Sequence, residues 1–80
     1  MTVTVRLFAS YAESLGKSEV EVTIHDGATV GEVVSSLVAA AGDRRLPPSP
    51  LVAVNCAYAT RLTRLSQGDE VAIIPPVAGG

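Results

Sequence analysis

Hydrophobic and polar residues alternate along three stretches of the chain, at residues 2–8, 19–24 and 70–74. A period of two is typical of strands that bury one face. Residues 51–55 predict a further strand, and residues 58–62 a short edge piece. The side chains that alternation turns inward are Val3, Val5, Leu7, Val20, Val22, Ile24, Val71 and Ile73.

The best-signalled element is a helix that follows Thr29. Thr29 and Glu32 have the spacing of a capping box, and Gly42 supplies a C-terminal stop. Ser10 and Glu13 repeat this spacing and predict one or two helical turns that end at Gly16. The apolar stripe that recurs at helical spacing comprises Val30, Val33, Val34, Leu37, Val38 and Ala41.

One amphipathic helix lying across one mixed sheet is an economical way to bury these faces, and it places the chain in the α+β class. Residues 43–50 contain three prolines and predict a loop. If the first and last strands run parallel side by side, Phe8 and Ile74 share one end of the sheet and face away from the helix. We expect this pair, joined by Tyr58, to form a partner surface. In the alternative interpretation these side chains pack beneath the loop or are scattered.

The sequence ends in a tail, residues 75–80, which we expect to be flexible and to follow a folded domain at 1–74. Its last residues are Gly79 and Gly80, which lack a Cβ and make the chain end as thin as it can be. Six residues past Ile74 could reach roughly 20 Å when extended. Such a tail suits delivery of a terminal carboxylate into the narrow active site of another protein.

Composition limits the classes of function. The chain has 80 residues, 48% of them hydrophobic, and a net charge of −2, which argues against nucleic-acid and anionic-membrane partners. Its single cysteine cannot form an internal disulfide and fits a reducing compartment. No signal segment and no run of about 18 apolar residues is present, so we expect a cytoplasmic protein.

The sequence offers few side chains suited to catalysis. His25 and Cys56 are the only histidine and cysteine, too few for a zinc site, and we expect no metal and no bound cofactor. Cys56 could act as a nucleophile with His25 as its base, but both are more simply turn residues. The useful group is the carboxylate of Gly80, which is ionised and unreactive near pH 7. Acyl chemistry there requires activation by another enzyme with ATP, after which a sulfur donor could leave a thiocarboxylate.

Four segments carry a resemblance to the small subunit of molybdopterin synthase, and the resemblance runs from end to end. Its most specific part is the ending Pro75-Pro76-Val77-Ala78-Gly79-Gly80. The segments are 7–9 together with 15–16, then 27–32, 51–55 and 68–80.

The resemblance implies a ubiquitin-like β-grasp fold and a sulfur carrier. It implies an E1-like adenylyltransferase and a sulfurtransferase as partners, with Gly80 as the sulfur-bearing residue and Gly79 as its slender neighbour. The tail would enter the large subunit and give sulfur to cyclic pyranopterin monophosphate for dithiolene formation. Two small subunits would flank a dimer of large ones, and the chain would be the non-catalytic sulfur-donor subunit. The positions implied to contact partners are Phe8, Tyr58, Ile74, Pro75, Pro76 and Val77.

Three alternatives to this function stay open at the level of sequence. The first is a carrier for thiamine thiazole synthesis, although such carriers usually lack a proline pair like Pro75-Pro76. The second is a carrier for cysteine or another sulfur metabolite. The third is a ubiquitin-like tag conjugated to lysines of target proteins, or a plain interaction module.

Overall fold

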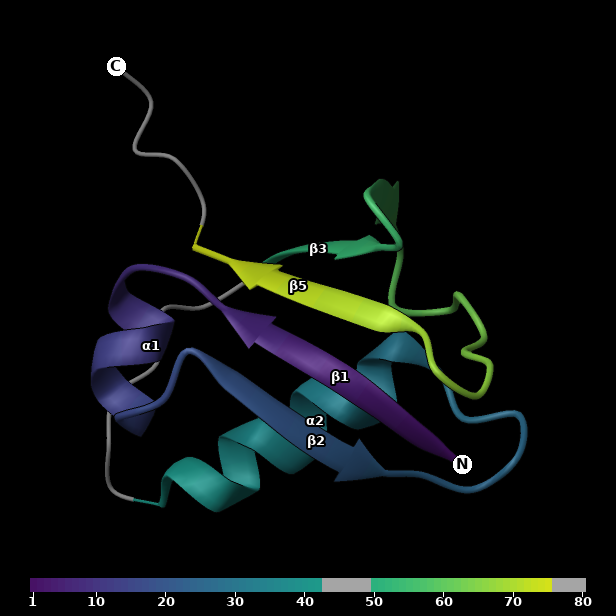
Figure 1. Ribbon diagram of the computed structural model, residues 1–80, viewed down its shortest axis with the longest axis horizontal. Helices are drawn as coiled ribbons and strands as arrows, with labels where there is room; N and C mark the ends of the chain where they lie inside the picture. Colours follow the sequence, from purple (N-terminus) through teal and green to yellow (C-terminus); the bar gives the residue numbers. More distant parts are fainter. Residues whose placement is uncertain (43–49, 76–80) are drawn as a thin grey trace.

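The computed structural model describes residues 1–42 and 50–75, and it places one mixed sheet against one main helix (Figure 1). This architecture confirms the predicted α+β class. The elements in chain order are β1 (Thr2–Leu7), α1 (Ser10–Leu15), β2 (Glu19–Thr23), α2 (Val30–Ala41), β3 (Leu51–Val54), β4 (Ala57–Ala59) and β5 (Glu70–Ile74).

The strands lie in the order β2-β1-β5-β3-β4, so β5 is the middle strand. β1 and β5 run parallel with Leu7 opposite Ile73, whereas the other neighbouring pairs are antiparallel. The first and last strands are therefore neighbours in the interior of the sheet. This confirms the expectation that the first and last strands lie side by side.

The strand boundaries follow the alternation closely. β5 occupies the predicted residues 70–74, and the strands predicted at 2–8, 19–24 and 51–55 each end one residue earlier. The edge piece predicted at 58–62 exists as β4, but its predicted bounds were wrong, because β4 begins one residue earlier and ends three residues earlier. Each early end marks the point where the chain leaves the sheet for a turn or a bend.

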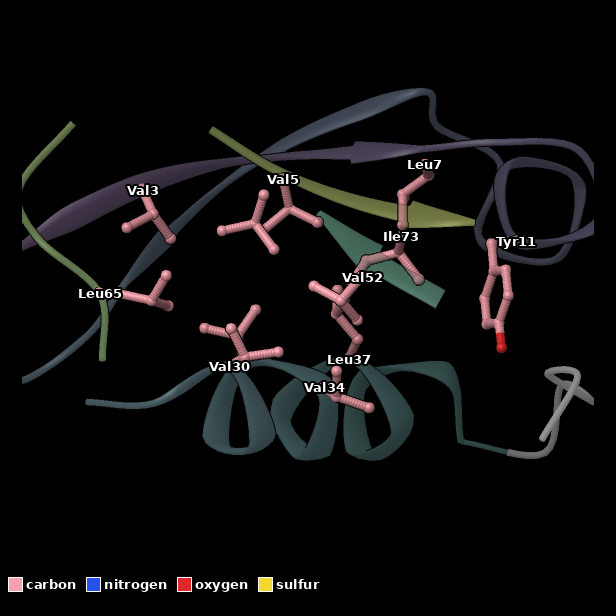
Figure 2. Packing of buried hydrophobic residues seen from close by; sticks show 12 residues of the cluster. Val3, Val5, Leu7, Tyr11, Val30, Val34, Leu37, Val52, Leu65 and Ile73 are labelled. Carbon is pink, nitrogen blue, oxygen red and sulfur yellow. The ribbon is translucent and has the colours of Figure 1, made fainter. Parts of the chain in front are cut away.

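The core fills the space between α2 and the sheet (Figure 2). The inward side chains of β1 and β5 are at most 3% exposed, so the central strands contribute the most completely buried area. The inward residues of β2 are only partly buried, because β2 is an edge strand. Burial raises the pKa of the Tyr11 hydroxyl, and the Arg61 guanidinium acts in the opposite direction.

α2 begins with the predicted capping box. The amide of Glu32 donates to Thr29 Oγ1 at 3.4 Å, and the amide of Thr29 donates to Glu32 Oε2 at 2.7 Å. Five of the six stripe residues are buried, but the inclusion of Val38 was wrong, since it is 55% exposed. Val38 lies about 80° around the helix from Val30, at the margin of the stripe, where the sheet no longer covers it.

α1 starts differently from the prediction. Its N-cap is Ala9, and no side chain caps it, so the capping box assigned to Ser10 and Glu13 was wrong. The chain turns directly out of β1, and Ala9 takes φ 49° and ψ −123° to make that turn. The helix consequently begins one residue too early for Ser10 to act as its cap. The stop at Gly16 is confirmed, with φ 70° and its amide donating to Ala12 O.

Two predicted segments fall largely outside the described residues. Of the loop at 43–50 the structure describes Pro50, and of the tail at 75–80 it describes Pro75. The division into a domain and a flexible tail therefore stays a prediction. Within the described ranges, no helix has the length and apolar character needed to cross a membrane.

The start of α2 is packed closely against the segment that follows β4. The amide of Gly31 donates to Arg61 O at 3.0 Å, and a Cβ at residue 31 would lie 3.2 Å from that oxygen. We expect Gly31→Val to lower the free energy of unfolding by more than about 1 kcal/mol, because its methyl groups must displace Arg61. Urea denaturation measures this. Ser36→Val, at an exposed position of the same helix, is the matched control and should change stability much less.

Candidate functional site

The parallel pairing of β1 and β5 determines where the chain leaves the fold. The amide of Phe8 donates to Ile73 O at 3.3 Å, so Phe8 and Ile74 lie beside each other where these two strands end. Both follow an inward-facing residue and therefore point away from α2. Phe8 is 44% exposed, and Ile74 is half-buried. The described chain ends one residue later, at Pro75, so the predicted tail begins at this surface.

Strand pairing extends this surface across the sheet. Leu51 lies opposite Ile74, and Ala53 lies between Ala72 and Tyr58. Each of these residues has a chain neighbour that is buried in the core or packed against it, so they share the sheet face that α2 does not cover. We call this surface the outer apolar face, and it comprises Phe8, Leu51, Ala53, Tyr58, Ala72 and Ile74.

The structure places Phe8 and Ile74 side by side, and it places Tyr58 on the same sheet face but two strands away from β5. Their role as partner contacts stays a prediction. Tyr58 is 80% exposed on edge strand β4. Pro75 is half-buried at the end of β5. The remaining predicted site residues, Pro76, Val77, Gly79 and Gly80, lie outside the described residues.

Sequence reasoning missed Leu51, which is 39% exposed and directly opposite Ile74. A signal was present in the predicted strand at 51–55, because alternation there turns Leu51 and Ala53 to the face opposite Val52. What could not be read from the sequence was the pairing of β3 with β5. That pairing makes Leu51 part of the outer apolar face.

Charged residues border the outer apolar face on the side of β2. Arg6 Nε lies 3.2 Å from Glu70 Oε2, and Arg6 Nη2 lies 3.6 Å from Glu19 Oε1. All three side chains are about half exposed, so these pairs contribute little to stability. Their effect is to separate an apolar half of the outer sheet surface from a polar half.

A two-residue turn holds Tyr58 in position. Asn55 and Cys56 both have positive φ, at 49° and 70°, as a tight hairpin with the twist of the strands requires. Asn55 Nδ2 donates to Asp69 Oδ1 at 2.9 Å, and Asn55 Oδ1 accepts from the amide of Glu70 at 3.0 Å. The β3–β4 hairpin is thereby fastened to the start of β5. Cys56 is exposed in this turn, as predicted.

His25 is a solvent-exposed turn residue, as expected, but it also has a partner. Its Nε2 lies 2.8 Å from Glu32 Oε1, and its Nδ1 lies 2.9 Å from Asp26 O. Both partners are acceptors, so the doubly protonated ring satisfies both contacts. The hydrogen bond to Glu32 is the main cause that raises the pKa of His25, and the same bond lowers the pKa of Glu32.

These shifts predict a pH dependence of stability. The contribution of His25 is complete below its ordinary pKa of 6.5 and is lost as pH rises through its raised folded value. The contribution of Glu32 is complete above its ordinary pKa of 4.5 and is lost as pH falls through its lowered folded value. We expect the urea midpoints of the native chain and His25→Gln to differ most between pH 4.5 and 6.5. Their convergence as pH rises through the raised pKa of His25 would bear this out, and a difference independent of pH would contradict it.

The described residues also bear on metal and nucleophilic chemistry. Within 1–42 and 50–75, no three His, Cys, Asp or Glu side chains are grouped so that they could hold a metal ion. His25 is engaged by Asp26 and Glu32, and Cys56 lies in the hairpin turn fastened to β5. The arrangement therefore offers a binding face beside the exit of a chain end.

A five-stranded mixed sheet packed on one main helix, with its uncovered face apolar where the last strand ends, defines a ubiquitin-like β-grasp protein. Comparison with known proteins agrees with this class. The sequence matches the ThiS family over residues 5–80, and the chain belongs to that family. Its relatives place it among β-grasp sulfur carriers and ubiquitin-like modifiers.

Three relatives illustrate the range of similarity. Small archaeal modifier protein 3 of Haloferax volcanii is 36% identical, with both chains covered completely. The crystal structure of SAMP1 from the same organism is 32% identical with a TM-score of 0.82, again with both chains fully covered. A chain in the complex of subunits 1 and 2 of molybdopterin-converting factor from Helicobacter pylori is 25% identical. Its TM-score is 0.71, and coverage is 100% of each chain.

Proposed function

We propose that this chain carries sulfur as a thiocarboxylate on Gly80. The observation that carries the proposal is the position of the chain exit. β5 ends in the interior of the sheet beside Phe8, on the outer apolar face, and the ThiS family match continues through Gly80. A partner that binds this face holds the start of the tail and directs the remaining residues into its own active site.

The chemistry divides between the carrier and its partners. An E1-like adenylyltransferase uses ATP to convert the Gly80 carboxylate into an acyl adenylate, which makes the carbonyl carbon electrophilic. The outer sulfur of a sulfurtransferase persulfide attacks that carbon and AMP leaves. A thiol then cleaves the resulting acyl disulfide, which releases the thiocarboxylate and leaves a disulfide on the sulfurtransferase side. Gly79 and Gly80 keep the end narrow enough for the channels of both enzymes. The carrier itself supplies the surface that its partners recognise and a tail long enough to enter their active sites.

We further propose that the sulfur acceptor is bound by a molybdopterin synthase large subunit and becomes the dithiolene of molybdopterin. The similarity to the Helicobacter pylori subunit supports this pathway, as does the ending Pro75-Pro76-Val77 before the last three residues. In such a complex Phe8, Tyr58 and Ile74 would contact the large subunit. A carrier for thiamine thiazole or cysteine synthesis would use the same tail with a different acceptor enzyme.

Intact-mass spectrometry tests the carrier function. The chain incubated with its activating enzyme, ATP and a sulfurtransferase should gain the mass difference between sulfur and oxygen at Gly80. Addition of the large subunit and the pterin precursor should return the mass to that of the carboxylate. If the sulfur-bearing species never forms while ATP is consumed, the carrier proposal is wrong.

The relatives favour one other function, a ubiquitin-like modifier. Small archaeal modifier protein 3 matches the chain from end to end, and a modifier would use the same terminal diglycine. Here the activated Gly80 carbonyl would be joined to a lysine of a target protein. The same mass spectrometry separates the two functions, because a modifier yields isopeptide conjugates with target proteins in place of a free thiocarboxylate.

A further inference from the structure

Strand β2 forms one edge of the sheet, with β1 as its single neighbour in the part of the chain that the structure describes (Figure 1). Met1 and Ile24 exchange two hydrogen bonds of 2.7 Å each at one end of this ladder. Such pairs recur at every second residue of an antiparallel ladder, so Val20 and Val22 also bond to β1. The residues that direct their N–H and C=O groups away from the sheet are therefore Glu19, Glu21 and Thr23.

The outer side of this free edge is negatively charged. The side chains of Glu19, Glu21 and Thr23 are exposed, because the residues between them pack against the core. Glu19 lies 3.6 Å from Arg6, whereas Glu21 has no ion-pair partner within residues 1–42 and 50–75. Side chains directly opposite each other on neighbouring strands share a face. A strand added to this edge would therefore place a side chain beside the Glu21 carboxylate, and lysine or arginine suits that position.

The inner side of the same edge offers an apolar hollow. The hollow has a volume of about 160 Å³ and is lined by Leu15, Lys17, Val20, Leu37 and Ala40. Successive side chains of a strand point to opposite faces, so an added residue opposite Val20 points toward the hollow. An aliphatic side chain suits this position. The ammonium group of Lys17, at the border of the hollow, disfavours a further positive charge on this side.

A second copy of the chain does not suit the edge. Antiparallel pairing over the whole of β2 would place Glu21 directly opposite the same residue of the other molecule. Like charges in that position destabilise a strand pair, and charged side chains commonly protect edge strands from self-association. The same carboxylates attract a strand of opposite charge. Charge complementarity therefore favours a different protein with basic residues on one face of an extended segment.

We propose that the free edge of β2 binds an extended segment of a partner protein, in which aliphatic residues alternate with lysine or arginine. The segment adds to the sheet beside β2, and its backbone bonds to the outward N–H and C=O groups supply much of the affinity. Its basic side chains lie over the glutamates of β2, and an aliphatic side chain enters the hollow. Because β1 separates β2 from β5, this edge is distinct from the outer apolar face. The proposal does not depend on the chemistry of Gly80.

The test is an NMR titration of the full chain, labelled with nitrogen-15, with an acetylated peptide in which lysine alternates with valine. The amide signals of Glu19, Glu21 and Thr23 should shift. Hydrogen exchange of these amides should slow at least about tenfold at saturation, because they gain hydrogen-bond partners. A peptide with serine in place of valine should bind at least about tenfold more weakly, since it loses apolar burial in the hollow. A peptide with glutamate in place of lysine should not bind.

A charge reversal tests the electrostatic part of the proposal. Glu21→Lys should weaken binding of the lysine peptide at least about fivefold, because it puts like charges opposite each other. Glu13→Lys is the matched control. It makes the same change in net charge at an exposed position of α1 and should leave the affinity nearly unchanged. An effect of net charge alone would act equally in both variants.

A proline tests the backbone part of the proposal. Thr23→Pro removes an outward N–H group without changing charge, and proline is tolerated on edge strands where the N–H faces solvent. Affinity for the lysine peptide should fall at least about tenfold, whereas Thr23→Val keeps the N–H group and should bind like the native chain. Urea midpoints report whether the fold is preserved. If Thr23→Pro does not fold, hydrogen exchange at Glu21 in the native chain decides the point.

Four outcomes would overturn the proposal. The first is the absence of shifts and protection along β2 with the lysine peptide. The second is a set of shifts confined to the outer apolar face. The third is an equal loss of affinity in Glu21→Lys and Glu13→Lys. The fourth is a dependence of the β2 signals on protein concentration without peptide, which would make a second copy the partner of this edge.

Discussion

Deletion of Gly80 is expected to abolish formation of the thiocarboxylate. The shortened chain ends at Gly79 and lacks the residue that carries the transferable sulfur, so the sulfur-bearing species should fall to background in intact-mass spectra. Folding should be unaffected, because an exposed chain end contributes little to stability. The urea midpoint of the variant should therefore equal that of the full chain.

The control for this deletion is Ala78→Ser, which alters the tail but preserves its length and its diglycine. This variant should accept sulfur nearly as well as the native sequence. Unchanged sulfur loading of the deletion variant would show that the sulfur is carried elsewhere. A deletion variant that failed to fold would show that the tail is part of the structure rather than a free end.

Replacement of Phe8 by aspartate is expected to weaken binding of the large subunit by more than about 1 kcal/mol, or roughly fivefold in Kd. Phe8 is the aromatic residue of the outer apolar face that lies beside the chain exit. A carboxylate there would have to be desolvated against an apolar partner surface. Titration calorimetry with the purified large subunit measures the change in affinity.

Val38→Asp provides the matched control for Phe8→Asp. Val38 is also a partly exposed apolar residue, at 55% against 44% for Phe8, but it lies on α2 behind the sheet. The charge introduced is identical, so a loss of affinity confined to Phe8→Asp would locate the interface on the outer apolar face. Equal losses would indicate a general effect of charge. Unchanged affinity in both variants would place the interface elsewhere.

The parts of the fold that could be predicted were those encoded by local patterns. The alternation at 70–74 predicted β5 without error, and the box formed by Thr29 and Glu32 predicted the start of α2. Both signals depend on a few neighbouring residues. The box at Ser10 failed because the route of the chain out of β1, rather than the local sequence, determines where α1 begins.

The site shows the same division between local and long-range information. Phe8 and Ile74 could be paired from the sequence because one parallel arrangement of the first and last strands brings them together. Leu51 was missed because its neighbour across the sheet depends on the pairing of β3 with β5, which the sequence does not reveal. Val38 was assigned to the core because the sequence does not show how far around the helix the sheet covers the apolar stripe.

The place of β5 in the sheet has a mechanical consequence. A force applied at the end of β5, such as withdrawal of the tail from a tight-fitting enzyme, acts along the backbone hydrogen bonds that join β5 to β1 and β3. Hydrogen bonds on both sides of β5 then resist the force together, whereas an edge strand would be held by a single ladder. The central position of β5 therefore gives the fold more resistance to a force applied at the end of this strand than an edge position would.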